Sequence, residues 1–141
     1  MTKSVLFVCN MNSVRSPMAA AILASRASGA MRVDSAGVYE GGLDPFVEDV
    51  LSEIGVSLGD YEPKAVSDIR LEAFDLVIAL TPEAAAEVRR FLPRERIEFW
   101  PIENPSDARG GRDALIEAYR AVRDDLRGRI RVRFPVLDER P

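Results

Sequence analysis

The sequence predicts an α/β protein in which helices cover both faces of a parallel sheet. Short apolar runs rich in β-forming residues alternate along the chain with segments of helical periodicity. Three of the helical segments begin with a capping residue followed by proline, a favoured start for a first helical turn. Parallel strands need crossover connections, so this alternation is typical of a parallel sheet.

Four segments are expected to be strands, and each is short and bounded by polar or turn-forming residues. The first is a continuous apolar run, as expected for a strand that is buried on both faces. The expected strands are residues 4–8, 31–35, 76–80 and 97–100.

Paired capping residues and prolines mark the expected helix starts at Ser16-Pro17, Asp44-Pro45 and Thr81-Pro82. The first two helices should end before Gly29 and Gly55, and the third near Phe91. A shorter helix is expected over residues 68–74 and a last one from about 113 to 128 or beyond, after a loop at 101–112. Residues 129–134 fit either a helix or extended chain.

Four strands with four or five helices favour the flavodoxin-like order 2-1-3-4 within a single domain of residues 1–141. In that order the strand sequence reverses beside the first strand. A ligand crevice is then expected at the carboxyl end of that strand. Cys9 lies there by its sequence position alone.

Composition excludes several functional classes. The formal net charge is −4, so no nucleic-acid partner is expected, and any anion must be bound by a local site. One cysteine allows no internal disulfide, and with no histidine no structural metal site or cofactor is expected. The apolar run at 5–8 is too short for a signal peptide or membrane span. We therefore expect a cytoplasmic protein with no membrane partner.

Residues 9–15, Cys-Asn-Met-Asn-Ser-Val-Arg, carry the candidate chemistry. A loop between a strand end and a helix start can turn its backbone N–H groups toward an anion. The same positive field favours the thiolate form of a cysteine, which makes Cys9 a candidate nucleophile. Arg15 could bind two oxygens of a phosphate with its planar guanidinium.

A structural interpretation of the same residues is also open. A lone cysteine is often a small buried hydrophobe, and Cys-x5-Arg occurs by chance in many chains. The position of Cys9 between a first strand and a capped helix favours the functional interpretation. Asn12 favours it further, because asparagine tolerates the left-handed conformation that a tight loop needs.

The sequence resembles the low-molecular-weight protein tyrosine phosphatases in residues 8–17, 34–37, 44–45 and 74–79. The resemblance implies their four-stranded fold, with a phosphorylated protein or small aryl phosphate as substrate and no metal. It implies that Cys9 is the nucleophile, Arg15 the phosphate ligand and Ser16 a hydroxyl that holds the thiolate. The phosphate-binding residues would be Asn10, Met11, Asn12, Ser13, Val14 and Arg15, with Asn12 left-handed and supported by Ser35.

Three departures from the family pattern are visible. The aspartate that acts as general acid is replaced in Asn104-Pro105, and an amide cannot donate that proton. Asp107 or Glu103 could substitute, and Asp107 is favoured because Gly110-Gly111 could let its loop fold over the anion. Both are equally compatible with a solvated loop. A second loop cysteine is replaced by Val14, and the family's tyrosine pair after the proline is replaced by Ser106-Asp107. A histidine of the network behind the loop corresponds loosely to Tyr61.

The final third of the chain, in residues 100–105 and 118–124, resembles the thioredoxin-coupled arsenate reductases of the same fold. Those enzymes relay electrons through two further cysteines, which this chain lacks. The leading hypothesis is therefore a phosphomonoester hydrolase that binds oxyanions such as phosphate, sulfate or arsenate. The alternatives are an arsenate reductase that uses Cys9 with an external thiol and a non-catalytic phosphate-recognition module.

Overall fold

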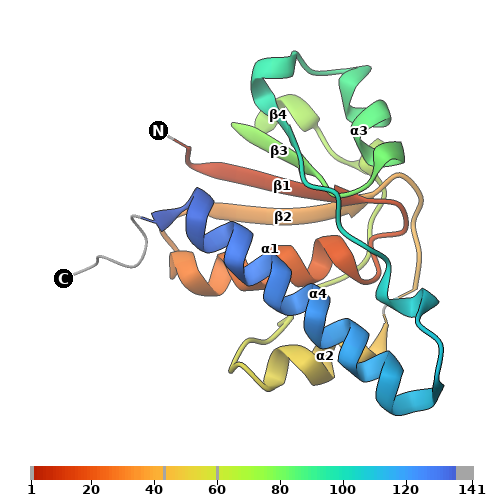
Figure 1. Ribbon diagram of the computed structural model, residues 1–141. Helices are drawn as coiled ribbons and strands as arrows, with labels where there is room; N and C mark the ends of the chain where they lie inside the picture. Colours follow the sequence, from red (N-terminus) through yellow and green to blue (C-terminus); the bar gives the residue numbers. More distant parts are fainter. Residues whose placement is uncertain (1, 43, 60, 136–141) are drawn as a thin grey trace.

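Figure 1 shows the computed structural model, which describes residues 2–42, 44–59 and 61–135. The described chain contains a four-stranded sheet in the order β2-β1-β3-β4. Every neighbouring pair is parallel, which confirms the predicted fold and strand order. The strands are β1 (Ser4–Cys9), β2 (Arg32–Gly37), β3 (Leu76–Ala79) and β4 (Ile97–Phe99).

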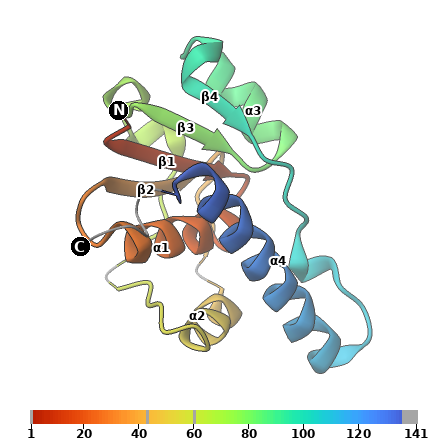
Figure 2. The same cartoon turned by 60° about the vertical axis from the view of Figure 1, so that its left-hand side comes forward.

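Helices cover the two faces unequally. Figures 1 and 2 show α1 (Arg15–Ala27), α2 (Pro45–Ser52) and α4 (Gly111–Arg133) on one face, and α3 (Pro82–Arg89) against the other. The 3-10 turns are η1 (Val66–Asp68), η2 (Leu71–Ala73), η3 (Arg94–Arg96) and η4 (Pro105–Asp107).

The buried core has two halves, one on each side of the sheet. Alternate residues of a strand point to opposite faces. Phe7 and Cys9 of β1 therefore belong to the core beneath α1, α2 and α4, whereas Leu6 and Val8 belong to the core beneath α3. Cys9 thus ends a fully buried strand and faces the helix that follows it.

Two predicted helix caps are confirmed and one is wrong. The Asp44 side chain accepts a hydrogen bond from the Phe46 amide at 2.9 Å, and Thr81 accepts one from the Ala84 amide at 3.0 Å. Helix α1 instead begins at Arg15 after Val14, so Ser16 is not its cap. The Ser16 hydroxyl instead forms its hydrogen bonds behind the 9–15 loop. Pro17 lies in the first turn, where a backbone N–H has no partner within the helix, so its missing N–H costs no helical hydrogen bond.

The chain differs from expectation in two other places. Residues 68–74 do not form one helix, because the backbone is extended at Ile69 and Arg70 between η1 and η2. Helix α4 starts at Gly111 and continues to Arg133, which resolves residues 129–133 as helical. Its last turns bury Ile130 against the core, and burial of such an apolar face is what stabilises a helix in a protein.

Candidate active site

The carboxyl ends of the strands converge on the 9–15 loop. The Cys9 carbonyl accepts a hydrogen bond from the Val38 amide after β2 at 2.9 Å. The Asn10 carbonyl accepts one from the Tyr39 amide at 2.8 Å, which fixes the loop against the chain after β2. This is the edge at which the strand order reverses, and Cys9 lies there as predicted.

Cys9 and Ser16 form the centre of the site. Cys9 is only 2% exposed, and its Sγ lies 2.9 Å from Ser16 Oγ. The Asn12 Nδ2 group donates to the same Ser16 oxygen at 2.8 Å. The Ser16 hydroxyl also lies 3.3 Å from the Ala36 carbonyl oxygen, to which it can donate. Ser16 has one proton, which can therefore be directed either to a Cys9 thiolate or to the Ala36 carbonyl.

Asn12 is the rigid point of the loop. It is fully buried and has a φ of 52°, so the predicted left-handed conformation is confirmed. The Tyr61 hydroxyl donates to the Asn12 carbonyl oxygen at 2.6 Å and also contacts Asn12 Oδ1. The Lys64 amide donates to Asn12 Oδ1 at 2.9 Å. These bonds fix the amide orientation, so Nδ2 is the group left to reach Ser16.

Tyr61 is a neutral hydrogen-bond donor in this network. Burial raises the pKa of its hydroxyl above the ordinary tyrosine value, so the proton is retained at any physiological pH. The loose correspondence of Tyr61 to the network behind the loop is thus confirmed by its position. Ser35 was predicted to support Asn12, and the structure does not show this. Ser35 Oγ is buried and makes no hydrogen bond within the part of the chain that the structure describes.

Gly37 permits the close approach of the loop to β2. A Cβ atom at this position would lie 2.4 Å from the Tyr39 carbonyl oxygen and 2.6 Å from the Asn12 amide nitrogen. No side chain fits there without displacing the loop backbone. In the sequence, Gly37 stood out only as part of the family resemblance. The need for a residue without a side chain at one position produces no periodic pattern.

The remaining loop residues contribute differently. The Asn10 side chain is turned toward α3, where it accepts from Thr81 Oγ1 at 2.6 Å and donates to Glu83 Oε1 at 2.9 Å. Val14 is buried in the core and Met11 is exposed. The structure therefore brings Cys9, Asn12 and Ser16 into one network but does not place the side chains of Asn10 and Val14 in it.

Arg15 is half-buried at the first position of α1. Its Nη1 group donates to the Ile102 carbonyl oxygen at 3.0 Å. The guanidinium is thereby tethered to the chain after β4. A guanidinium has five donors, so this single bond leaves others for an oxyanion.

The chain after β4 holds no acid at the predicted general-acid position. Asn104 Oδ1 accepts from the Ser106 amide at 3.1 Å and the Ser106 hydroxyl at 2.7 Å, which makes it the cap of η4. Asp107 and Glu103 are exposed and line a hollow of about 550 Å³ against α4. Gly110 and Gly111, with φ of 113° and 87°, lead directly into α4.

Within residues 2–42, 44–59 and 61–135, no three His, Cys, Asp or Glu side chains gather as a metal site would require. No helix in the described chain is both long and apolar enough to cross a bilayer.

Comparison with known proteins agrees with this geometry. Over residues 4–136 the chain matches the family model described as low molecular weight phosphotyrosine protein phosphatase. It is 32% identical to a low molecular weight protein-tyrosine-phosphatase of Streptomyces coelicolor, covering 86% of this chain and 88% of that protein. It is 27% identical to an arsenate reductase of Bacillus subtilis, covering 92% of this chain and 93% of that protein.

Solved structures show the same fold. An arsenate reductase in the phosphate binding state superposes with a TM-score of 0.75 at 24% identity, covering 97% of this chain and 98% of that one. Residues 4–136, which the family model matches, contain the whole sheet, the 9–15 loop and α4. The chain therefore belongs to the low molecular weight phosphotyrosine protein phosphatase family.

Proposed function

We propose that the protein hydrolyses phosphomonoesters through a covalent intermediate on Cys9. The observation that carries this proposal is the position of the thiol. Cys9 Sγ lies 2.9 Å from Ser16 Oγ at the end of a buried strand, directly before a helix whose first residue is Arg15. An anion held over that helix start would have the sulfur beneath it.

In the first step the Cys9 thiolate attacks phosphorus, an S–P bond forms and the bond between phosphorus and the leaving oxygen breaks. The Ser16 hydroxyl stabilises the thiolate by donating to it, and it turns to the Ala36 carbonyl once the negative charge has left the sulfur. Backbone N–H groups of residues 10–14 and the Arg15 guanidinium bind the phosphoryl oxygens, whose charge is greatest in the transition state.

The second step returns the enzyme to its starting state. Water attacks phosphorus, the S–P bond breaks, and Cys9 leaves as a thiolate while inorganic phosphate is released. The Arg15 tether to Ile102 is exchanged for phosphate oxygens when the anion enters. No metal is required for either step, because Arg15 and the loop amides supply the positive charge.

The leaving oxygen needs a proton when it is a poor leaving group. Asn104 has none to give, and we propose Asp107 for this role. Asp107 stands at the end of the single turn that Asn104 caps, on the same connection as the carbonyl that holds Arg15. Glu103 is the competing carboxylate, and substitution of each residue separates the two.

We propose aryl phosphates and phosphotyrosine in proteins as the substrate class, and the cytoplasm as the compartment. Met11 and Tyr39 are large side chains exposed beside the loop, 46% and 57% respectively, and offer apolar surface to an aromatic ring. A reducing compartment keeps a lone catalytic thiol in its active form.

The test is a set of parallel assays on the purified protein. p-Nitrophenyl phosphate, a phosphotyrosine peptide, and arsenate with several thiols are offered separately, and inhibition by phosphate, sulfate and vanadate is measured. We expect turnover of p-nitrophenyl phosphate and competitive inhibition that is weakened in Arg15→Ala. Oxyanion binding without any turnover would establish the recognition module instead. Oxyanion binding unchanged in Arg15→Ala would place the site elsewhere.

Arsenate reduction is the second candidate, because relatives named arsenate reductases match over nine-tenths of this chain. Arsenate would esterify the Cys9 thiolate with loss of water. An external thiol then attacks the sulfur, which gives a mixed disulfide with Cys9 and releases arsenite, since two electrons pass to arsenic. A second external thiol reduces the mixed disulfide. This function predicts arsenate turnover that depends on the added thiol, with little phosphatase activity.

A further inference from the structure

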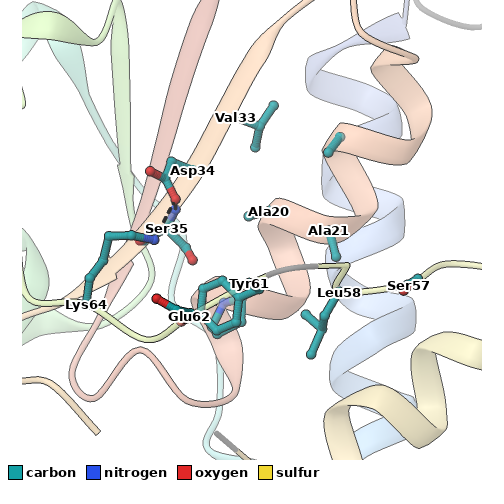
Figure 3. Close-up of a pocket in the computed structure, with 12 residues that line it drawn as sticks. Ala20, Ala21, Val33, Asp34, Ser35, Ser57, Leu58, Tyr61, Glu62 and Lys64 are labelled. Atoms are coloured by element: carbon teal, nitrogen blue, oxygen red, sulfur yellow. Dashed lines mark hydrogen bonds and ion pairs between the residues drawn. The ribbon is translucent and has the colours of Figure 1, made fainter. Parts of the chain in front are cut away.

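A pocket lies next to Tyr61 and Lys64, the residues that hold Asn12 of the 9–15 loop. Its volume is about 390 Å³, within the range of small-molecule sites. Figure 3 shows its walls: the exposed side of α1, the end of β2, and the segment that contains Leu58 and Tyr61. The pocket shares no residue with the loop itself.

One wall of this pocket is flat and apolar. Helix α1 presents Ala20, Ala21 and Ala24, whose methyl groups leave the room that larger side chains would fill. Leu58 faces this wall across the opening, as Figure 3 shows. A flat ring between these surfaces would bury apolar area on both of its faces.

The inner end of the pocket is polar and contains an unsatisfied group. Ser35 is fully buried, and its Oγ has no hydrogen-bond partner among the residues described. Buried hydroxyls are normally hydrogen-bonded, so this one can donate to a ligand. Asp34, Glu62 and Lys64 also line the pocket, and Lys64 Nζ is paired with Asp34 Oδ1 at 2.9 Å. The net charge of these three side chains is negative.

This charge selects the chemistry of the occupant. A carboxylate would be repelled by Glu62, which forms no ion pair with any residue that the structure describes, whereas a neutral amide meets complementary groups. Its carbonyl oxygen can accept from Ser35, and its N–H₂ group can donate to the Glu62 carboxylate. The class that fits is an uncharged aromatic ring that carries a carboxamide.

Tyr61 connects the pocket to the catalytic loop. Its ring forms part of the pocket wall, and its hydroxyl donates to the Asn12 carbonyl oxygen at 2.6 Å. A ligand packed against the ring would hold the tyrosine where it supports the left-handed Asn12. We propose that this pocket is an effector site for an uncharged aromatic carboxamide, which strengthens oxyanion binding by fixing Tyr61 against the 9–15 loop.

The first measurement uses benzamide as probe and the intact protein. Benzamide is titrated while backbone amide resonances are followed by NMR, and benzoate is titrated in parallel as the charged control. We expect saturable shifts at Ala21, Ser35 and Tyr61 with benzamide and much weaker binding of benzoate. No saturable shift at these residues overturns the proposal. This arm needs no oxyanion and is independent of the proposed function.

The second measurement tests the coupling, and here the inference rests on the proposed function. Phosphate affinity is measured with and without saturating benzamide, and we expect an increase of about threefold or more. Phosphate must raise benzamide affinity by the same factor, because coupling between two sites is reciprocal. Unchanged phosphate affinity refutes the effector role. If the protein binds no phosphate at all, the proposed function is refuted. The benzamide titration then still tests whether the pocket binds the carboxamide.

Two variants locate the site. Ala21→Leu should fill the pocket and abolish benzamide binding, while Ser25→Leu on the same helix, outside the pocket, should leave it intact. Ser35→Ala should weaken benzamide binding by at least about fivefold, because it removes the hydroxyl that would donate to the carboxamide. Benzamide binding that survives both Ala21→Leu and Ser35→Ala contradicts the assignment.

Discussion

The two loops that flank the candidate active site differ in how they are held. The 9–15 loop is fixed from behind, because Asn12 receives hydrogen bonds from Tyr61 and Lys64 and passes one to Ser16. The connection of residues 100–110 caps its own short turn through Asn104, and its carboxylates Glu103 and Asp107 are exposed. Within the residues that the structure describes, one side-chain hydrogen bond joins the two loops, from Arg15 to the Ile102 carbonyl oxygen.

In the proposed mechanism this difference separates two parts of phosphoryl transfer. There, binding the anion and generating the thiolate depend on the 9–15 loop, which Tyr61 and Lys64 hold in place. Protonating the leaving group depends on the 100–110 connection, where an amide stands in the acid position. Anion binding and protonation of the leaving group should therefore respond to different substitutions, which separate the two in experiment.

Cys9→Ser should remove turnover while leaving anion binding nearly intact. A serine hydroxyl is not ionised at neutral pH, so the nucleophile is lost. We expect the rate with p-nitrophenyl phosphate to fall by more than about 10³-fold, as is typical when a nucleophile is deleted. Phosphate affinity, measured by calorimetry in the same preparation, provides the control for folding. A rate within tenfold of wild type would contradict the covalent mechanism.

Asn104→Asp should raise the rate for phosphotyrosine more than for p-nitrophenyl phosphate. Tyrosine phenolate has a conjugate-acid pKa of about 10 and needs a proton as it leaves, whereas nitrophenolate is a far more stable anion. General acid catalysis supplies about 10²–10⁴-fold, so the gain for phosphotyrosine can approach that range. The measurement is the dependence of kcat/KM on leaving-group pKa in wild type and variant.

The wild-type slope itself decides whether Asp107 acts. A steep fall in rate with rising leaving-group pKa means that the acid position is empty. A shallow slope that becomes steep in Asp107→Asn, and not in Glu103→Gln, supports Asp107 as the donor. A shallow slope that persists in both variants refutes either carboxylate as the acid.

Sequence reasoning predicted the sheet and the position of the 9–15 loop well, because both depend on local patterns. Buried strands appear as apolar runs, and Cys9, Asn12 and Arg15 appear as a spaced motif at a strand–helix junction. The cap at Asp44 is equally local, since its side chain bonds an amide two residues away.

The features that sequence reasoning missed depend on contacts between distant segments. The family resemblance implied the contact of Ser16 with Cys9, but not the bond from its hydroxyl to the Ala36 carbonyl twenty residues away. The Lys64 amide reaches Asn12 across fifty-two residues, and a backbone donor leaves no trace in the sequence. The prediction that Ser35 supports Asn12 was wrong, because the Tyr61 hydroxyl, and not Ser35, donates a hydrogen bond to Asn12.

Tyr61→Phe should weaken the hydrogen bonding that holds the 9–15 loop and leave the 100–110 connection unaffected. The variant loses one donor to Asn12, while the Lys64 amide remains. A single hydrogen bond contributes about 0.5–1.5 kcal/mol, so we expect phosphate affinity and kcat/KM to fall about two- to tenfold. The slope against leaving-group pKa should not change, because proton donation is untouched.

Tyr119→Phe is the matched control for Tyr61→Phe. Its hydroxyl also makes one buried contact, to Asp44, but this joins α4 to the start of α2 rather than supporting the 9–15 loop. We expect lower stability and unchanged phosphate affinity. Equal losses of phosphate affinity in both variants would show that Tyr61 acts through general stability alone.

The smallest effect is expected at Glu53, which stabilises the helix that follows the 100–110 connection. Glu53 pairs with Arg120 at 2.7 Å and with Arg123 at 2.6 Å, both on α4. Hydrogen bonds from Arg120 and then Arg123 lower the pKa of Glu53 from 4.5 to about 2. Because the folded pKa of Glu53 is depressed, its contribution to stability is complete above pH 4.5 and is lost as the pH falls toward 2.

Glu53→Gln should lower the Tm at pH 7 by roughly 1–4 °C, as expected for a partly exposed ion-pair network. The difference in Tm from wild type should shrink through that acidic window, since every other carboxylate is common to both proteins. Phosphate affinity should stay unchanged throughout, because the 9–15 loop is held independently of α4. A Tm difference that stays constant down to pH 2 would mean that the ion pairs with Arg120 and Arg123 contribute nothing.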